Sequence, residues 1–548
     1  MANPVQEAQR TVRHFRQIVL WPLQLMPLRE SAQIQKHWEA LQQDGASSPW
    51  REVQDEFTGD PAQFQGRHYR EFVTFLPHVQ RFLYGEGAAR GDKGCESPIR
   101  VFRRADIARV RLTFAGDEAN PLVCDVAHID LYFFYDIDVV ILAVEIAAAD
   151  IDLSRAHEAL YRFGRSYPTY WEADGTGGHC PKRVEWLSAG GEVLAASDYE
   201  RREKYLARVC QYRAADIASH WDFVLRPLVH HHSDDQGPIR FRLVEYHRMP
   251  VLGYLAMQDV GQVTRADFVR LALVAGAGDP QVLPFSERHL RDFEYRYCND
   301  RYWNAEGDGP RGARYMCSGD ALMLVGDASD RFFADRVSGV LEQFRHQYFL
   351  LFLIAHFHKA ALLMLSDRLV EALNRLDIQD ADSVRRFKRL IRQLKEIFLR
   401  FTHRYWFHEL SDQAQAKELY RMCREFLGTD KLYDEVREEI QDMSEYLDSD
   451  SLRRQANTVV RLTVVTVFGL IGTVTTGFLG MNLLSEADNP LWVKIAYFFA
   501  VTVPVAWLTF YTIVKSKRLS DFLEALSDER LSARDKLGAL VSVWSRPK

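Results

Sequence analysis

The end of the chain carries two long apolar runs, VVRLTVVTVFGLIGTVTTGFL at residues 459–479 and LWVKIAYFFAVTVPVAWLTFYTIV at residues 491–514. At ~1.5 Å per residue, a helix of either length crosses a hydrocarbon core of about 30 Å. The segment between them, GMNLLSEADNP at residues 480–490, is too short to form a domain. The pattern therefore predicts a transmembrane hairpin over residues 459–514, closed by a tight turn on one face of the membrane.

Basic residues stand at the two outer ends of this hairpin, whereas its turn is acidic. Arg453, Arg454 and Arg461 lie before or at the start of the first apolar run, and Lys515, Lys517 and Arg518 follow the second run. The turn holds Glu486 and Asp488 and neither Lys nor Arg. Because Lys and Arg favour the cytoplasmic side, we expect a multi-pass protein of the cell (inner or plasma) membrane with both termini in the cytoplasm. Residues 515–548 would form a cytoplasmic C-terminal tail.

The overall composition excludes some classes of function. The 548 residues include 69 Lys and Arg against 75 Asp and Glu, a net charge of −6. Nucleic-acid-binding proteins concentrate positive charge, so this balance argues against a nucleic acid as partner. The seven cysteines are scattered without paired spacing, which fits reduced cytosolic thiols better than a disulfide framework. No pairing of a nucleophile with a base is apparent, and no enzyme is expected.

Residues 1–330 are predicted to form a cytoplasmic α/β domain. Near its start, Val12, Phe15, Ile18 and Val19 have the spacing of a short apolar helix face. Runs rich in Val, Ile, Phe and Tyr then predict strands at residues 99–102, 110–114, 122–126, 129–135, 139–146, 239–246, 251–257 and 313–324. Residues 139–144 are apolar throughout, as in a strand that is buried on both faces. We therefore expect a mixed sheet flanked by helices, one of which begins at Ser154.

Residues 331–458 are predicted to form a helical bundle and a stalk. Residues 347–365 are apolar enough to be considered as a third membrane helix. His356, His358 and Lys359 near the middle of this segment favour a buried cytosolic helix instead, because a charge is costly in lipid. A last helix is expected to begin after Gly428-Thr429-Asp430 and should continue without a break into the first membrane helix. Its seam for lengthwise packing on partners comprises Tyr433, Val436, Ile440, Met443 and Leu447.

The sequence Gly480-Met481-Asn482 lies at the outer end of the first membrane helix, in a hairpin close to the C-terminus that a basic segment follows. This arrangement resembles the CorA-type divalent metal cation transporters, which have two C-terminal transmembrane helices and a Gly-Met-Asn motif. The resemblance covers the hairpin in detail and the preceding chain in outline. It implies a membrane channel or transporter for divalent metal cations, a homopentamer, and a pore lined by the first transmembrane helix.

Under this resemblance, Gly480, Met481 and Asn482 form the selectivity filter. Amide oxygens of Asn482 could hydrogen-bond the water shell of Mg²⁺, an ion that dehydrates reluctantly. Mg²⁺ is therefore the first candidate ion, with Co²⁺, Ni²⁺ or Zn²⁺ as others, and no organic cofactor is expected. Glu486 and Asp488 would attract cations to the outer mouth.

A single hairpin cannot enclose a pore, so conduction requires several copies around an axis. A stripe at three- and four-residue spacing would line the pore: Val459, Leu462, Thr466, Leu470, Thr473 and Gly477. Hydroxyl rings between apolar constrictions suit a hydrated path that is gated by dewetting. The alternative is that these threonines simply bond the carbonyls of their own helix.

The expected stalk is acidic between residues 430 and 450. Its acids are Asp430, Asp434, Glu435, Glu438, Glu439, Asp442, Glu445, Asp448 and Asp450, against Lys431 and Arg437. One hypothesis makes Glu435, Glu438, Glu439 and Asp442 a regulatory metal site, where Mg²⁺ relieves repulsion between neighbouring stalks. The other hypothesis makes the acids a solvated helix face. For the whole protein, the rival to a transporter is a non-conducting, membrane-anchored scaffold or sensor with a large cytoplasmic domain.

Overall fold

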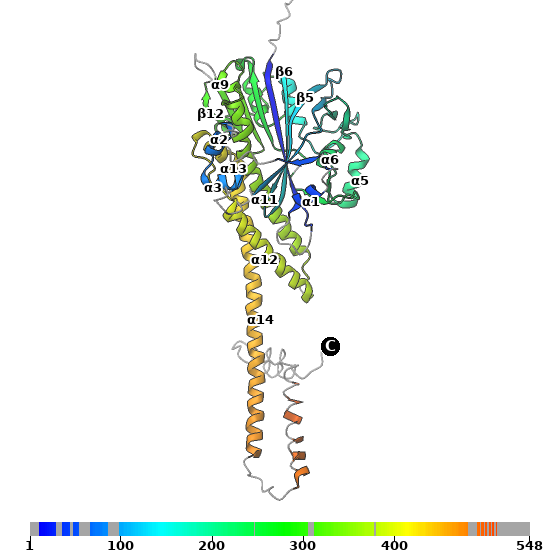
Figure 1. Ribbon diagram of the computed structural model, residues 1–548, viewed down its shortest axis with the longest axis vertical. Helices are drawn as coiled ribbons and strands as arrows, with labels where there is room; N and C mark the ends of the chain where they lie inside the picture. Colours follow the sequence, from blue (N-terminus) through cyan, green and yellow to red (C-terminus); the bar gives the residue numbers. More distant parts are fainter. Residues whose placement is uncertain are drawn as a thin grey trace, which may run out of the picture. The chain divides into compact units, whose positions relative to one another are not determined.

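The computed structural model describes residues 10–28, 36–43, 48–53, 66–85, 98–245, 247–304, 312–377 and 380–480, with shorter pieces between residues 490 and 511. The chain divides into two compact units, Met1–Ile440 and Gln441–Lys548, and each is described by itself. All the described strands belong to the first unit (Figure 1).

The strands are β1 (Thr11–Leu25), β2 (Trp50–Glu52), β3 (Ile99–Arg104), β4 (Arg109–Thr113), β5 (Leu122–Phe134), β6 (Ile137–Asp152), β7 (Arg183–Leu187), β8 (Val193–Ala196), β9 (Leu228–His230), β10 (Ile239–Leu243), β11 (Val251–Met257), β12 (Cys298–Trp303), β13 (Gly312–Cys317) and β14 (Ala321–Asp327). The helices are α1 (His37–Gln43), α2 (Gly66–Thr74), α3 (Pro77–Tyr84), α4 (Leu153–Arg162), α5 (Arg202–Tyr212), α6 (Ser219–Leu225), α7 (Arg265–Ala272), α8 (Glu287–Tyr297), α9 (Arg331–Ala334), α10 (Val340–Gln343), α11 (Phe349–Asn374), α12 (Ala381–Arg404), α13 (Ala414–Leu427) and α14 (Thr429–Gly480). A 3-10 turn, η1 (Val260–Gln262), and a π-helical turn, η2 (Phe344–Tyr348), complete the described elements.

The first unit is built on one sheet of 14 strands, whose main order is β12-β13-β14-β11-β1-β6-β5-β4-β7-β8. β10 also pairs with β1 and leads to β9, while β3 pairs with β5 and leads to β2. β11 runs parallel to β14, and β9 parallel to β10, among otherwise antiparallel neighbours. The predicted mixed sheet is therefore confirmed.

β1 corrects the expectation of a helix near the N-terminus. Val12, Phe15, Ile18 and Val19 are all buried, but they lie in a strand of 15 residues at the centre of the sheet. Residues 17–25 of this strand are buried without interruption, so the alternation that marks a half-buried strand is missing. Spacing alone therefore could not separate this strand from a helix.

The other predicted strands occur, but two of them are merged into one strand and a third is divided into two. Residues 122–126 and 129–135 form the single strand β5, with an irregular register between Val126 and His128. Residues 313–324, predicted as one strand, form β13 and β14, because the chain turns at Gly319 with a φ of +84°. The helix expected at Ser154 is α4, where Asp152 caps the backbone N–H of Ser154.

Helices cover both faces of the sheet centre. Gly164, just after α4, lies against the Val19 side chain. Ile18, the preceding residue of β1, faces a cavity that is also lined by Phe349 of α11. Because neighbouring residues of a strand point to opposite faces, α4 and α11 lie on opposite sides of β1.

α11 is the one described helix that is long and apolar enough to cross a membrane, within a segment spanning Val340–Asn374, yet 78% of its most apolar window is buried inside the protein. Its polar groups have protein partners. The His356 Nε2 lies 3.3 Å from the Gly319 carbonyl, and the Lys359 Nζ lies 3.0 Å from Glu245. Burial lowers the pKa of His356 and of His358 to about 3, so both imidazoles are neutral. These contacts support the expectation that this helix is buried inside the protein.

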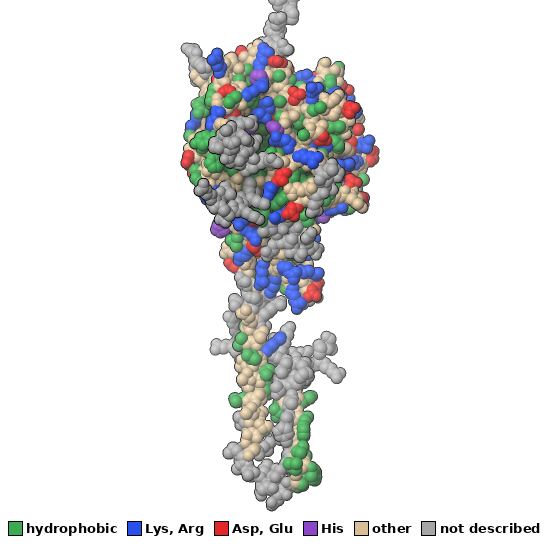
Figure 2. Space-filling model, viewed as in Figure 1, with side chains coloured by type: hydrophobic (Ala, Val, Ile, Leu, Met, Phe, Trp, Pro, Cys, Tyr) green, Lys and Arg blue, Asp and Glu red, His purple; other side chains and the backbone are tan. Residues whose placement is uncertain are grey.

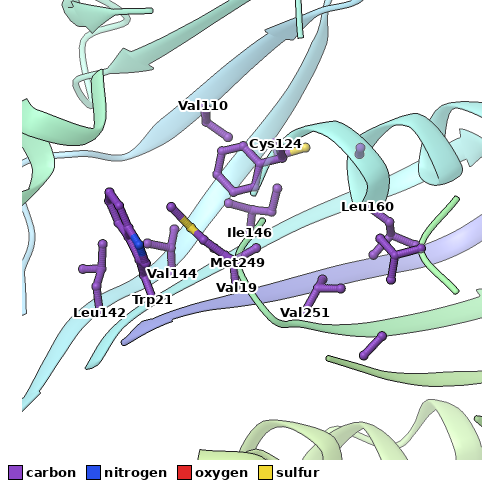
Figure 3. Packing of buried hydrophobic residues seen from close by; sticks show 14 of the residues in the cluster. Val19, Trp21, Val110, Cys124, Leu142, Val144, Ile146, Leu160, Met249 and Val251 are labelled. Carbon is purple, nitrogen blue, oxygen red and sulfur yellow. The ribbon is translucent and has the colours of Figure 1, made fainter. Parts of the chain in front are cut away.

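The core of the first unit centres on β1 and β6. Trp21 of β1 is 1% exposed and makes an edge-on contact with Trp221 of α6, with 5.9 Å between the ring centroids. Figure 3 shows Trp21 beside Leu142 and Val144 of β6. The aromatic ring therefore joins the sheet centre to a helix that covers it.

We expect Trp21→Ala to lower the unfolding free energy of the first unit by about 3–5 kcal/mol, the range for truncating a buried Phe or Trp. Thermal unfolding of the full chain, followed by near-UV circular dichroism, measures the effect. Val123→Ala on β5 is the matched control because Val123 is 45% exposed. Equal melting temperatures for the two variants would contradict the packing described here.

Candidate functional site

The predicted pore helix is the second part of α14, which is continuous from Thr429 to Gly480 over 52 residues. At ~1.5 Å per residue, such a helix is about 78 Å long. Gly428, with a φ of +66°, ends α13 and lets α14 begin at the next residue. The expectation of an unbroken helix from the stalk into the first apolar run is therefore confirmed.

The start of α14 is anchored inside the first unit. The Tyr433 ring stacks on Trp406, with 4.6 Å between centroids, and on Phe398 of α12, with 5.4 Å. Val436 and Ile440, on the same side of the helix, are 1% and 3% exposed. The predicted seam therefore begins as a contact with the chain's own helices rather than with another copy.

The six predicted pore-lining residues all lie on α14 and are all exposed in the single chain: Val459, Leu462, Thr466, Leu470, Thr473 and Gly477. Val459, Leu462 and Leu470 are 63%, 67% and 64% exposed. An apolar stripe of this kind is unusual on a surface that faces water. It requires lipid or other copies of the chain to cover it.

The threonine hydroxyls of the stripe bond their own helix, as the sequence alternative anticipated. Thr466 Oγ1 donates to the Leu462 carbonyl at 2.8 Å, and Thr473 Oγ1 donates to the Gly469 carbonyl at 2.9 Å. A hydroxyl has one donor hydrogen and two acceptor lone pairs. Each bond uses the hydrogen, so the lone pairs remain able to accept from a water molecule. The two sequence interpretations are therefore compatible.

The second apolar run packs against a different side of α14. Its described residues, in short pieces from 491 to 511, are helical. A methyl group added to Gly472 would lie 2.8 Å from the Val505 side chain, so the two segments come close at this glycine. Gly472 is buried, whereas Leu470 and Thr473 beside it are exposed. Small residues allow membrane helices to approach closely, and this contact leaves the stripe uncovered.

One of the three residues predicted for the filter lies at the end of α14. Gly480 is the last residue of the helix and is exposed. Met481, Asn482, Glu486 and Asp488 lie outside the residues that the structure describes. Their roles therefore stay predictions.

The four residues of the hypothetical regulatory site are exposed on α14: Glu435, Glu438, Glu439 and Asp442. Glu435 has a weak pair with Lys431, at 3.6 Å. Among the described residues of the single chain, no group of three or more His, Cys, Asp or Glu side chains could hold a metal ion. The regulatory metal site therefore stays a prediction.

A known protein family matches the part of the chain that contains α14. Residues 370–518 match the family model of the CorA-like Mg²⁺ transporter protein. This CorA-like region starts near the end of α11 and includes α12, α13, α14 and the second apolar run. The match confirms the resemblance found in the sequence and supports, in general terms, a membrane protein that transports divalent cations.

Two further comparisons gave no match. A search of curated proteins found no relative, and a search of solved structures found no similar chain. The match to the family model starts at residue 370, after the whole sheet.

A charged cavity of about 170 Å³ lies on the sheet outside the CorA-like region. At one wall, the buried Glu145 of β6 accepts hydrogen bonds from two guanidinium groups. Arg16 of β1 lies 2.5 Å from Glu145 Oε1, and Arg345 donates to both carboxylate oxygens at 2.9 and 3.2 Å. Burial by itself would raise the pKa of the Glu145 carboxyl, but Arg345 and Arg16 hold it below its ordinary value.

Other charged residues that line the cavity are paired in the same way. Arg103 donates to both carboxylate oxygens of Asp130, at 2.8 and 2.9 Å. His346 Nδ1 lies 3.1 Å from Glu71 of α2. Arg345 and His346 belong to the π-helical turn η2, and such turns often occur at functional sites. The positive and negative charges around the cavity are paired with one another. These pairs hold η2 on the sheet through Arg345 and His346.

This cavity could not be predicted from the amino-acid sequence. Its charged residues come from β3, β5, β6, α2 and η2 and are far apart in the chain. Isolated charges in predicted strands, such as Asp130 and Glu145, are the only sequence signal. That signal does not identify their partners.

We expect Glu145→Gln to lower the unfolding free energy of the first unit by about 3–5 kcal/mol at pH 7, because Arg16 and Arg345 lose a buried partner. The Glu145 pKa is lower in the folded state than the ordinary value of 4.5. Its stabilising contribution is therefore complete above pH 4.5 and is lost as the pH falls through the lowered value. The difference between wild type and variant should shrink in acid.

Thermal unfolding of the full chain between pH 3 and pH 7 measures this effect (roughly the range set by carboxyl titration). Asp125→Asn is the control because Asp125 pairs with Arg109 at an exposed position of β5. A constant difference between Glu145→Gln and wild type across this range would contradict the assignment.

Proposed function

We propose that the protein is a channel or transporter for divalent metal cations, with Mg²⁺ first and Co²⁺, Ni²⁺ or Zn²⁺ as other candidate ions. The path is a homo-oligomeric pore, five copies by family resemblance, lined by the first transmembrane helix. The observation that carries the proposal is the exposed stripe on α14 within the CorA-like region. The ion is the substrate, and the protein lies in the cell membrane with both termini in the cytoplasm.

The stripe supplies the chemistry that a hydrated cation needs. Leu462 and Leu470 alternate with Thr466 and Thr473 along one side of α14. The waters of a hydrated Mg²⁺ direct their hydrogens outward, toward acceptors. The hydroxyls of Thr466 and Thr473 have acceptor lone pairs left after bonding their own helix. Rings of leucine would close the path when it dries.

The filter is assigned to Gly480, Met481 and Asn482, with Glu486 and Asp488 at the outer mouth. Gly480 ends α14, which supports a filter at the exit of the pore helix. A ring of neutral Asn482 amides would hold the water shell of the ion without removing it. Neutral groups also let the ion leave, which conduction requires.

The first test of function is Mg²⁺ uptake into liposomes that contain the full-length protein. We expect Asn482→Ala to change uptake about tenfold or more, because the ring that selects the hydrated ion is lost. The oligomer mass in nanodiscs serves as the control and should not change. Equal uptake by both proteins would exclude the filter assignment. Absence of uptake by a wild-type oligomer would favour the scaffold or sensor.

The second test uses two matched threonines. Thr473 lies in the stripe, whereas Thr476 lies to its side, and both donate to carbonyls of their own helix. Valine has the shape of threonine without the hydroxyl. We expect Thr473→Val to reduce uptake several-fold and Thr476→Val to leave it within about twofold, because a single exposed hydroxyl contributes little to stability. Equal effects of the two substitutions would argue against the stripe as the pore lining.

A further inference from the structure

α12 carries a concentrated positive charge on its exposed side. Its basic residues are Arg385, Arg386, Lys388, Arg389, Arg392, Lys395, Arg400 and Arg404, against Asp382 and Glu396. Figure 2 shows Lys and Arg side chains gathered at the end of this helix. The apolar side of α12 is not available to a partner, since Phe387, Ile391 and Phe398 are 3%, 1% and 6% exposed. Only the charged side can meet one.

Two arginines at the middle of this side have no counter-charge. Arg389 and Arg392 are exposed and form no ion pair with any residue that the structure describes. By contrast, Arg385 pairs with Asp382, and Arg400 pairs with Glu396. Arg389 and Arg392 are three residues apart, so they lie together on one face of the helix.

The first turns of α14 present the opposite charge in the same way. Glu438 and Glu439 are exposed and have no ion pair within the described part of the chain. Glu435 has the weak pair with Lys431 already described. These acids point away from the buried side formed by Val436 and Ile440. The chain therefore has a basic face and an acidic face that do not neutralise each other.

The two faces lie at similar heights along the helices. Phe398 of α12 stacks on Tyr433 of α14. In Figure 1, the first turns of α14 and the α12 helix, which slants away from them, both extend below the sheet. At ~1.5 Å per residue, Glu435 and Glu438 lie about 3 and 8 Å beyond Tyr433, and Arg392 and Arg389 lie about 9 and 14 Å beyond Phe398. Rotation of a second copy about an axis parallel to α14 does not change these heights. The arginines of one copy therefore lie within about one helical turn of the height of the acids of the next copy. The spacing of three residues is the same on both faces.

We propose that the basic face of α12 (Arg389 and Arg392) docks on the acidic face of α14 (Glu435 and Glu438) of a second copy of this chain. The inference rests on the proposed function in one respect, the assembly of several copies around α14. The arginines supply a counter-charge for acids that one of the two sequence hypotheses gives to a regulatory metal. An antiparallel contact places Arg392 opposite Glu435 and Arg389 opposite Glu438.

The test is a charge exchange in the full-length protein in nanodiscs. Arg389→Glu with Arg392→Glu, and separately Glu435→Arg with Glu438→Arg, should each shift the oligomer mass toward smaller species. The combination of all four substitutions should restore the mass. An unchanged oligomer mass in either double variant overturns the proposal. So does a quadruple variant whose oligomer mass is smaller than that of both double variants. Circular dichroism reports whether each protomer remains folded.

A disulfide trap identifies the partner directly. Two tagged chains, one with Arg389→Cys and one with Glu438→Cys, are expressed together in a Cys210→Ser background, because Cys210 is exposed. A disulfide between the two tags can form only between copies. His403→Cys, exposed on α12 but about 21 Å along the helix from residue 389, is the matched control. Equal or absent cross-linking of both cysteines overturns the proposal.

Two outcomes separate this inference from its alternatives. If the arginine pair is needed for binding to vesicles of anionic lipid and not for oligomer mass, the occupant is a membrane surface and the proposal fails. If charge exchange restores the oligomer but no variant or wild type transports Mg²⁺, the docking stands and the proposed function fails. If every variant takes up Mg²⁺ and keeps the wild-type oligomer mass, the proposed function stands and the docking fails.

Discussion

The antiparallel pairing of β1 with β6 is the contact on which the rest of the first unit depends. β1 also pairs with β10 and β11, so it joins the two halves of the sheet. The same pairing brings Arg16 beside Glu145, which in turn holds Arg345 of η2. Because α11 follows η2 directly, the sheet centre determines where the helical part of the chain begins. A change at Glu145 therefore acts on both layers.

Much of the C-terminal region could be predicted from the sequence because its signals are local. Length and apolarity predict the hairpin, and the apolar run that follows the stalk predicts the unbroken α14. β1 could not be predicted, since its burial on both faces removes the period of two. The turn at Gly319 was also missed, because one glycine between two apolar runs does not by itself end a strand. The cavity depends on residues such as Arg103 and Arg345, which the fold alone brings together.

The apolar part of α14 has two different sides, one that contacts the second apolar run and one that is exposed in a single chain. At Gly472, the absence of a side chain lets the second apolar run approach α14 closely. The stripe with Leu462 and Thr466 lies on another side and is exposed in a single chain. Such a surface is costly in water, at roughly 25 cal/mol for each Å² of apolar area. The proposed assembly within a membrane would remove that cost and would place the threonine oxygens near a shared axis.

The apolar sides of α12 and of the first turns of α14 are buried within one chain, so only their charged sides are exposed. Phe398 and Tyr433 stack inside one chain, so no apolar seam is left for a neighbour at this level. An exposed ion pair contributes only about 0.2–1 kcal/mol, whereas a fully buried leucine contributes about 1.5–3 kcal/mol. A contact made of a few arginines and glutamates can therefore open and close again without unfolding either helix. Its strength also depends on ionic strength, because charges are screened over about 8 Å at physiological salt. In the proposed assembly, this contact would therefore hold neighbouring copies together less tightly as the salt concentration rises.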